Sequence, residues 1–131
     1  MRNDLIWHKP NALPIRESDR LNLAHEHFFH FVKKPSYGRP KYYYDAAALT
    51  TRQTDVVSVL VEPGEDGHTA TFPRMLIEPR ILSCCPTGGT VLDPFCGTSR
   101  VLDVAIASRR NAIGFDLQSK FVDAAAERLP K

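Results

Sequence analysis

A run of small residues between a strand-like and a helix-like segment is the first place where this sequence could do chemistry. The run, FCGTS, occupies residues 95–99. Small side chains let main-chain N–H groups approach a ligand closely, and the N-terminus of the following helix attracts a carboxylate or a phosphate. The alternative is an ordinary turn between a strand and a helix. Gly97 does not decide between the two, because a dinucleotide-binding fingerprint has three glycines.

An acidic residue about twenty positions later favours a ligand site. Asp116 lies near the end of a second apolar stretch, residues 112–117. An acid at the end of the second strand of a βαβ unit can bind both hydroxyls of a ribose, and the neighbouring Leu117 can pack on an adenine ring. The sequence lacks the Gly-Lys-Ser/Thr of a phosphate-binding loop. A nucleoside cofactor bound without a phosphate cradle indicates S-adenosyl-L-methionine.

Helical segments flank this turn on both sides. The spacing of apolar residues predicts helices over residues 73–82, 99–110 and 119–129. We expect Ser99 to be the N-cap of the second helix, with Arg109 and Arg110 in its last turn, where cations suit the helix dipole. In the third helix the expected inward-facing residues are Phe121, Val122, Ala125 and Leu129.

Strand-like segments alternate with the helices. Residues 5–7 end one strand, and residues 42–44 begin a short one. The remaining strands are predicted at residues 25–32, 56–61, 90–94 and 112–117, the last two as buried strands. Strands alternating with helices in the second half of the chain predict an α/β fold with a parallel sheet.

The length and composition predict one small domain. The chain has 131 residues, and 43% of them are hydrophobic, which is enough to form a core. No apolar run reaches the roughly 18 residues of a membrane span, and residues 1–4 lack the apolar segment of a signal peptide. The three cysteines, two of them adjacent, form neither a disulfide framework nor a CxxC pair. We expect a cytoplasmic, reduced protein that does not enter a membrane.

Positive charge is concentrated in the first part of the chain. Residues 1–52 carry nine Lys/Arg against five Asp/Glu, whereas residues 53–131 carry eight against ten. Basic side chains interleaved with tyrosines in one loop-like stretch are typical of a nucleic-acid contact. These basic residues are Lys33, Lys34, Arg39 and Lys41. A solvated loop with packed aromatic side chains is the alternative.

Three histidines in one strand-like stretch raise the question of a metal site. His25 and His27 would lie on one face of a strand, and His30 on the other, so the three rings do not converge. We therefore expect no metal site.

Three motifs follow one another in order along the chain. They are HTATFP at residues 68–73 ahead of an apolar helix, VLDPFCG at residues 91–97, and GFD at residues 114–116. This series resembles the C-terminal portion of the β-class, permuted S-adenosylmethionine-dependent DNA amino-methyltransferases, which methylate N6 of adenine or N4 of cytosine. The front of the chain, with IWHKPN at residues 6–11, is similar to the family's segment after its catalytic strand. The resemblance covers residues 5–129.

The resemblance implies a fold, a cofactor and a substrate. The fold is a Rossmann-like S-adenosylmethionine-dependent methyltransferase fold, here partial and circularly permuted. The cofactor is S-adenosyl-L-methionine, and the substrate is DNA in a restriction-modification system. By position, Phe72 and Pro73 would line the methionine end of the cofactor, and Asp116 would bind the ribose. The matching residues of the cofactor loop are Asp93, Pro94, Phe95, Gly97 and Thr98. Those near the target base are Trp7, Lys9 and Asn11.

Two departures from the family pattern stand out. The family loop usually reads Gly-Ser-Gly-Thr, and here residues 97–100 read GTSR, so Ser99 replaces a glycine and predicts weaker cofactor binding. The catalytic tetrapeptide (Asp/Asn/Ser)-Pro-Pro-(Tyr/Phe) does not occur in the sequence. The one Asp-Pro pair, at residues 93–94, belongs to the cofactor strand.

The second departure affects the chemistry directly. Methyl transfer to an exocyclic amine needs an acceptor for the amine hydrogens and an aromatic ring against the flipped base. Trp7 and Asn11 could supply these groups, but a core tryptophan and a loop asparagine are the interpretation we favour. No catalytic residue is therefore assigned.

Three functional hypotheses follow from this pattern. The chain is a DNA methyltransferase or its C-terminal part, with residues 1–52 facing DNA and residues 53–131 binding the cofactor within one structural domain. It is alternatively a remnant that binds cofactor or DNA without turnover, or a subunit of a split enzyme whose partner polypeptide carries the catalytic half. Since such a part exposes sheet edges and apolar surface, we also expect self-association.

Overall fold

The computed structural model describes residues 1–49, 54–62 and 72–129, and the chain divides into two compact units. The first unit comprises Met1–Tyr42 and Thr50–Val61, and the second comprises Tyr43–Leu49 and Glu62–Lys131. The strand that follows residue 52 pairs with the N-terminal strand and belongs to the first unit.

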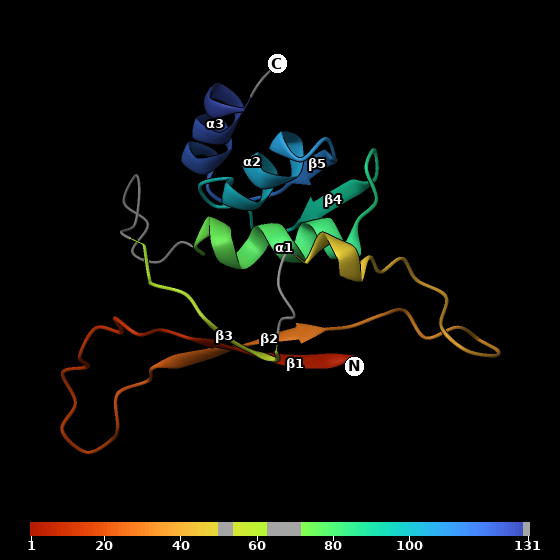
Figure 1. Ribbon diagram of the computed structural model, residues 1–131. Helices are drawn as coiled ribbons and strands as arrows, with labels where there is room; N and C mark the ends of the chain where they lie inside the picture. Colours follow the sequence, from red (N-terminus) through yellow and green to blue (C-terminus); the bar gives the residue numbers. More distant parts are fainter. Residues whose placement is uncertain (50–53, 63–71, 130–131) are drawn as a thin grey trace. The chain divides into compact units, whose positions relative to one another are not determined.

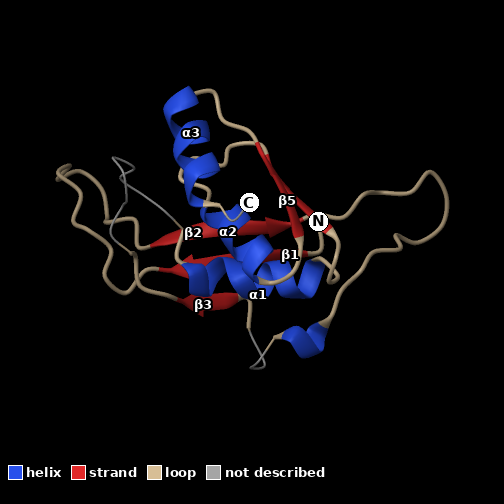
Figure 2. Cartoon of the chain, turned by 90° about the horizontal axis from the view of Figure 1, so that it is seen from above, coloured by secondary structure: helices blue, strands red, loops and turns tan. Residues whose placement is uncertain are grey.

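The first unit is built on a three-stranded sheet in the order β2-β1-β3. The strands are β1 (Asn3–His8), β2 (His25–His30) and β3 (Val56–Ser58). β1 runs antiparallel to β2, with Trp7 opposite Glu26, and parallel to β3, with Trp7 beside Val57. Figure 2 shows the three strands side by side. The strand predicted at residues 5–7 is confirmed, and the strands predicted over residues 25–32 and 56–61 both form but end earlier, at His30 and Ser58.

The two faces of this sheet differ in burial. Trp7 is 4% exposed, and with Val59 it forms the core of this unit. The opposite face of β2 is exposed and carries a row of rings from alternate residues. His27 and Phe29 are stacked with their centroids 5.7 Å apart, and Phe29 and Phe31 are 6.0 Å apart. His30 lies on the face that includes Trp7, so the predicted separation of the histidines is confirmed.

The second unit contains a parallel pair of strands joined by a helix, as Figure 1 shows. β4 (Thr90–Asp93) is followed by α2 (Arg100–Ala107) and β5 (Asn111–Gly114), with Asp93 beside Gly114. Before them come η1 (Ala46–Ala48) and α1 (Arg74–Cys84), and after them α3 (Ser119–Arg128). The core of this unit consists of Leu76, Ile77, Ile81, Leu102, Val104, Ala105, Phe121 and Ala125. In the described ranges, no helix is long and apolar enough to cross a membrane.

Two predictions about the strands were wrong. Residues 42–44 form no strand; a short helix, η1, follows them instead, because the side chain of Asp45 accepts a hydrogen bond from the Ala47 N–H and starts a turn. β4 and β5 are not buried on both faces, since Leu92 is 60% exposed and Ile113 is 48% exposed. Val91, Ala112 and Gly114 point the other way and are less exposed, so one face of the pair is covered and the other is open.

The helix ends also differ from expectation. Ser99 stands at the N-cap of α2, but its side chain makes no capping hydrogen bond. α2 ends at Ala107, so Arg109 and Arg110 follow the helix rather than forming its last turn. Arg109 has a left-handed conformation with φ 60°, which ends the helix. Val122 was expected to face inward and is 44% exposed.

Candidate functional site

The structure brings Asp116 and the small-residue turn into direct contact. The N–H of Gly97 donates to Oδ2 of Asp116 at 3.0 Å. The other carboxylate oxygen, Oδ1, accepts from the N–H of Gln118 at 2.9 Å, just before α3 begins. Asp116 therefore links the turn after β4 to the segment after β5, although 19 residues separate it from Gly97.

Main-chain hydrogen bonds continue beyond the ends of β4 and β5. They keep Asp93 and Asp116 at the same end of the two strands. The N–H of Phe115 donates to the carbonyl of Asp93 at 2.9 Å, and the N–H of Cys96 donates to the carbonyl of Phe115 at 2.8 Å. The carboxylate of Asp93 accepts from the N–H of Phe95 at 3.0 Å, which tightens the start of the turn. The site therefore lies at the carboxyl ends of parallel strands, where α/β proteins bind their ligands.

Two residues of the turn have left-handed backbone conformations. Gly97 has φ 47° and Ser99 has φ 64°. Glycine adopts this region without steric cost, whereas serine does not. Ser99 is fully buried, and in the described chain its hydroxyl has no hydrogen-bond partner. The backbone conformation at Ser99 therefore favours a glycine, which is the residue that the resemblance predicts there.

Cys96 lies behind the turn. Its side chain is 8% exposed and packs against β5, because a Cβ added at Gly114 would lie 3.0 Å from both Cβ and Sγ of Cys96. Burial raises the pKa of the Cys96 thiol, and the carboxylates of Asp93 and Asp116 raise it further. The thiol is therefore neutral at physiological pH and serves as packing rather than as a nucleophile.

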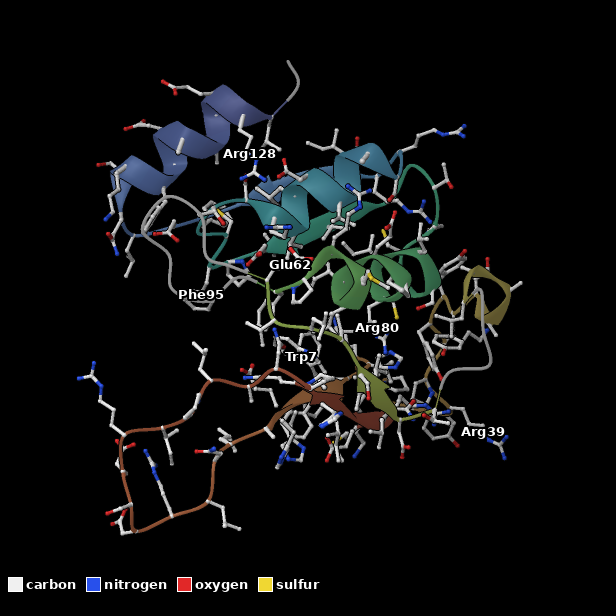
Figure 3. The ribbon with its side chains drawn as sticks, turned by 60° about the vertical axis from the view of Figure 1, so that its left-hand side comes forward. Trp7, Arg39, Glu62, Arg80, Phe95 and Arg128 are labelled. Atoms are coloured by element: carbon white, nitrogen blue, oxygen red, sulfur yellow. The ribbon has the colours of Figure 1, made fainter. Side chains whose placement is uncertain are left out.

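Several apolar side chains among the predicted site residues are exposed. Phe95 is 82% exposed, Leu117 is 100% exposed and Phe72 is 42% exposed; Phe95 is labelled in Figure 3. Pro73, next to Phe72, is fully buried as the residue before α1. Exposed rings and methyl groups of this kind can make apolar contacts with a ligand. The rest of the first motif, residues 68–71, lies outside the described residues.

Two charged contacts near the turn were not anticipated from the sequence. Arg128 of α3 donates to the carbonyl of Thr98 at 3.3 Å and pairs with Asp103 of α2 at 3.0 Å. Arg100 pairs with Glu62 at 2.8 Å. No motif marks these residues; only the position of Arg128 in the last turn of a predicted helix could have drawn attention to it.

The residues expected near a target base have other contacts within the first unit. The indole N–H of Trp7 donates to the carbonyl of Val59 at 2.8 Å, and the ammonium of Lys9 lies 4.9 Å from the ring centroid. Lys9 also pairs with Glu26. The side-chain amide of Asn11 binds both main-chain groups of Val61, at 2.8 and 3.1 Å. Trp7 is thus a core residue, as the favoured interpretation expected, and Asn11 lies in the loop after β1, where it binds the segment that follows β3.

The basic loop, defined as residues 33–41, connects β2 to the segment before η1. Lys33, Lys34, Arg39 and Lys41 are all exposed, and none of them has an ion-pair partner in the described ranges. Tyr37 is 97% exposed in the same loop. The four cations are therefore open to a polyanion. Across the residues that the structure describes, no cluster of three or more metal-binding side chains occurs.

Comparison with solved structures identifies the fold. The chain is similar to the M1.HpyAVI–SAM complex, with a TM-score of 0.78 and 23% identity over 99% of this chain and 62% of that one. It is also similar to a putative DNA modification methylase of Thermus thermophilus complexed with S-adenosyl-L-methionine, with a TM-score of 0.64 and 27% identity over 96% of this chain and 51% of that one. The predicted α/β, Rossmann-like methyltransferase fold is confirmed, and the chain spans part of it.

Comparison of sequences identifies the family. A relative from Citrobacter freundii, Type II methyltransferase M.Cfr9I, is 36% identical over 98% of this chain and 44% of its own length. The chain thus spans less than half of this relative. Residues 1–127 match the DNA methylase family. With nearly its whole length matched, the chain belongs to the DNA methylase family.

Proposed function

We propose that this chain is the S-adenosyl-L-methionine-binding part of a DNA methyltransferase that acts on the exocyclic amine of adenine or cytosine. The observation that carries the proposal is the Asp116–Gly97 hydrogen bond, which joins the two motifs of the nucleoside site at one sheet edge. The relatives are Type II methyltransferases, and a similar solved structure is a complex with this cofactor.

The residues present fit such a cofactor. Asp116 presents a carboxylate just beyond the end of β5, where it would accept hydrogen bonds from the ribose hydroxyls. Leu117 and Phe95 offer exposed apolar surface for the adenine, and Phe72 and Pro73 would line the methionine end. The proposed cofactor loop would also include Asp93, Pro94, Gly97 and Thr98. When bound, the cofactor supplies a methyl group on a sulfonium, and the chain's own residues bind and orient it.

Methyl transfer needs an acceptor for the amine hydrogens and an aromatic ring against the base. We propose that these groups come from outside this chain. The Pro-Pro-aromatic tetrapeptide is absent from the sequence, and Trp7 and Asn11 are already bonded within the first unit. Parallel sheets are normally covered on both faces. The exposed face of β4 and β5 therefore supports the proposal that a further layer of structure packs against it. A catalytic segment, in the same polypeptide or in a partner, would cover this face. A chain that binds cofactor or DNA without turnover is the second candidate.

We further propose that the basic loop contacts DNA phosphates. Its four exposed cations have no carboxylate partner in the described part of the chain, and Tyr37 offers a ring for stacking. Phosphate contacts make binding fall as salt rises. Replacing Lys33 and Lys34 by Ala should weaken DNA binding and reduce its salt dependence, measured by fluorescence anisotropy of a labelled duplex. An unchanged salt dependence would contradict the proposal.

Calorimetric titration with S-adenosyl-L-methionine tests the cofactor proposal. The wild-type chain should bind, and Asp116→Ala should abolish detectable binding. Asp123→Ala, which removes an exposed acid from α3, is the matched control and should bind like the wild type. Circular dichroism of each variant separates loss of binding from loss of folding. No heat at millimolar cofactor with the folded wild type would overturn the proposal.

A methylation assay tests the division of labour. The chain alone, incubated with DNA and tritiated cofactor, should transfer no methyl group. Adding a polypeptide with the N-terminal region of a Type II relative should restore transfer. Transfer by the chain alone would show that its own residues suffice for catalysis.

A further inference from the structure

The helix α3 is bonded to the cofactor turn at both of its ends. At its start, the N–H of Gln118 binds Asp116, which in turn binds the N–H of Gly97. At its end, Arg128 donates one N–H to the carbonyl of Thr98 and pairs through its other terminal nitrogen with Asp103. Arg128 is labelled in Figure 3.

Arginine suits this position because its planar guanidinium offers several donors in a fixed fork. One nitrogen binds the turn and the other binds the first turn of α2, so the two segments are fixed relative to each other. The partners are shielded from water, because Thr98 is 7% exposed and the side chain of Asp103 is 22% exposed. Such shielding strengthens a charge-assisted hydrogen bond over a fully exposed one.

The hydrogen bonds within the turn leave one of its main-chain N–H groups available to a ligand. The N–H of Gly97 is bound by Asp116, and the N–H of Ser99 donates to the carbonyl of Cys96 at 2.7 Å. Arg128 binds the carbonyl at the opposite end of that same Thr98–Ser99 peptide. Within the described residues, the N–H of Thr98 has no acceptor, and the peptides on both sides of it are fixed.

We propose that Arg128 is a positioning residue that orients the turn so that the Thr98 N–H faces the ligand. The inference rests on the proposed cofactor site. Arg128 acts through the Thr98 carbonyl and does not itself bind the cofactor. A positioning role predicts that loss of Arg128 loosens the turn before any ligand is present and weakens ligand binding as a consequence.

Amide hydrogen exchange in the ligand-free chain tests this without reference to binding. In Arg128→Met, the Gly97 and Ser99 amides should exchange about fivefold faster than in the wild type, with α1 amides unchanged. In Arg128→Lys the exchange rates should lie between those of the wild type and Arg128→Met, since a lysine ammonium cannot reproduce the fixed donor geometry of the guanidinium. The control is Arg74→Met, which removes another arginine of the second unit, one that pairs with Glu78 on α1 at 3.2 Å. Equal turn exchange in Arg128→Met and Arg74→Met would overturn the inference.

Calorimetry with S-adenosyl-L-methionine gives the second readout. Arg128→Met should weaken binding about fivefold, whereas Arg74→Met should not. Unchanged affinity in a folded Arg128→Met would also overturn the inference. If the wild type itself fails to bind, the cofactor proposal fails, and exchange in the turn still decides the role of Arg128. If Arg128→Met does not fold, the same comparisons apply to Arg128→Lys.

Discussion

At the scale of single residues, Ser99 is a serine at a position whose backbone conformation favours glycine. A serine with φ 64° costs roughly 1–2 kcal/mol relative to glycine, and its hydroxyl is buried without a partner in the described chain. Ser99→Gly removes both costs, so the free energy of unfolding should rise by about 1 kcal/mol after the loss of backbone entropy. Urea unfolding measures it. Ser99→Ala, which keeps the strain, should gain less, and a glycine variant less stable than the wild type would contradict this explanation.

Cys96 provides a second residue-scale prediction. Its raised pKa means less thiolate, so at pH 8.5 iodoacetamide should alkylate it on the order of tenfold more slowly than exposed Cys84. Mass spectrometry of each site gives the rates. The pKa is higher in the folded chain than in the unfolded one, so this thiol favours folding below its ordinary pKa, and that contribution is lost as pH rises through the folded value. Equal rates at the two sites would show that Cys96 is not shielded.

At the scale of elements, the contact between β5 and α2 leaves no room for a side chain at Gly114. A Cβ there would lie 2.5 Å from Cδ1 of Leu102 and 3.0 Å from Cys96. Gly114→Ala should therefore lower the free energy of unfolding by about 1–3 kcal/mol. Adding Leu102→Val, which removes Cδ1, should recover part of the loss relative to Leu102→Val alone. If the two changes were simply additive in urea unfolding, Leu102 would not be the obstruction.

The end of α1 depends on an arginine from the loop between α2 and β5. Arg110 donates to the carbonyl of Cys85 at 2.9 Å and to that of Leu82 at 3.5 Å, where helix carbonyls lack partners of their own. Arg110→Met should cost about 1–2 kcal/mol of stability, and Arg110→Lys less. Arg109→Met is the control. It changes the neighbouring residue, whose side chain is exposed, and should change stability little. Similar losses in both variants would contradict a specific bond.

At the scale of the whole molecule, the open face of β4 and β5 decides how the chain behaves alone. Leu92 and Ile113 lie side by side on this face and are exposed, and the exposed residues Phe115 and Leu117 follow β5 along the chain. An uncovered apolar stripe of this kind favours association. Without a catalytic segment to cover it, we expect the chain to self-associate as its concentration rises.

Static light scattering tests this expectation. Leu92→Lys should shift the chain toward the monomer, because a charge would be buried in the contact between copies. Leu21→Lys changes a 93% exposed leucine in a loop of the first unit and should leave association unchanged. A wild-type chain that stays monomeric at millimolar concentration, or equal effects of the two substitutions, would count against a role for this face.

The sequence by itself determined the order of most helices and strands and which two segments form the candidate site. Apolar periodicity located α1, α2, α3 and the strands around the turn, and the spacing of the turn and Asp116 identified two segments that meet at one sheet edge. Both signals are local: each depends on residues adjacent along the chain, whose types limit the backbone directly.

Only the tertiary structure decided which partners those residues have. The sequence could not show that Arg128 binds Thr98 30 residues away, or that Asn11 pairs with the main chain of Val61. It also could not show that one face of β4 and β5 is open, since apolar stretches look the same whether one face is covered or both. These outcomes depend on contacts between distant segments, which local residue types do not specify.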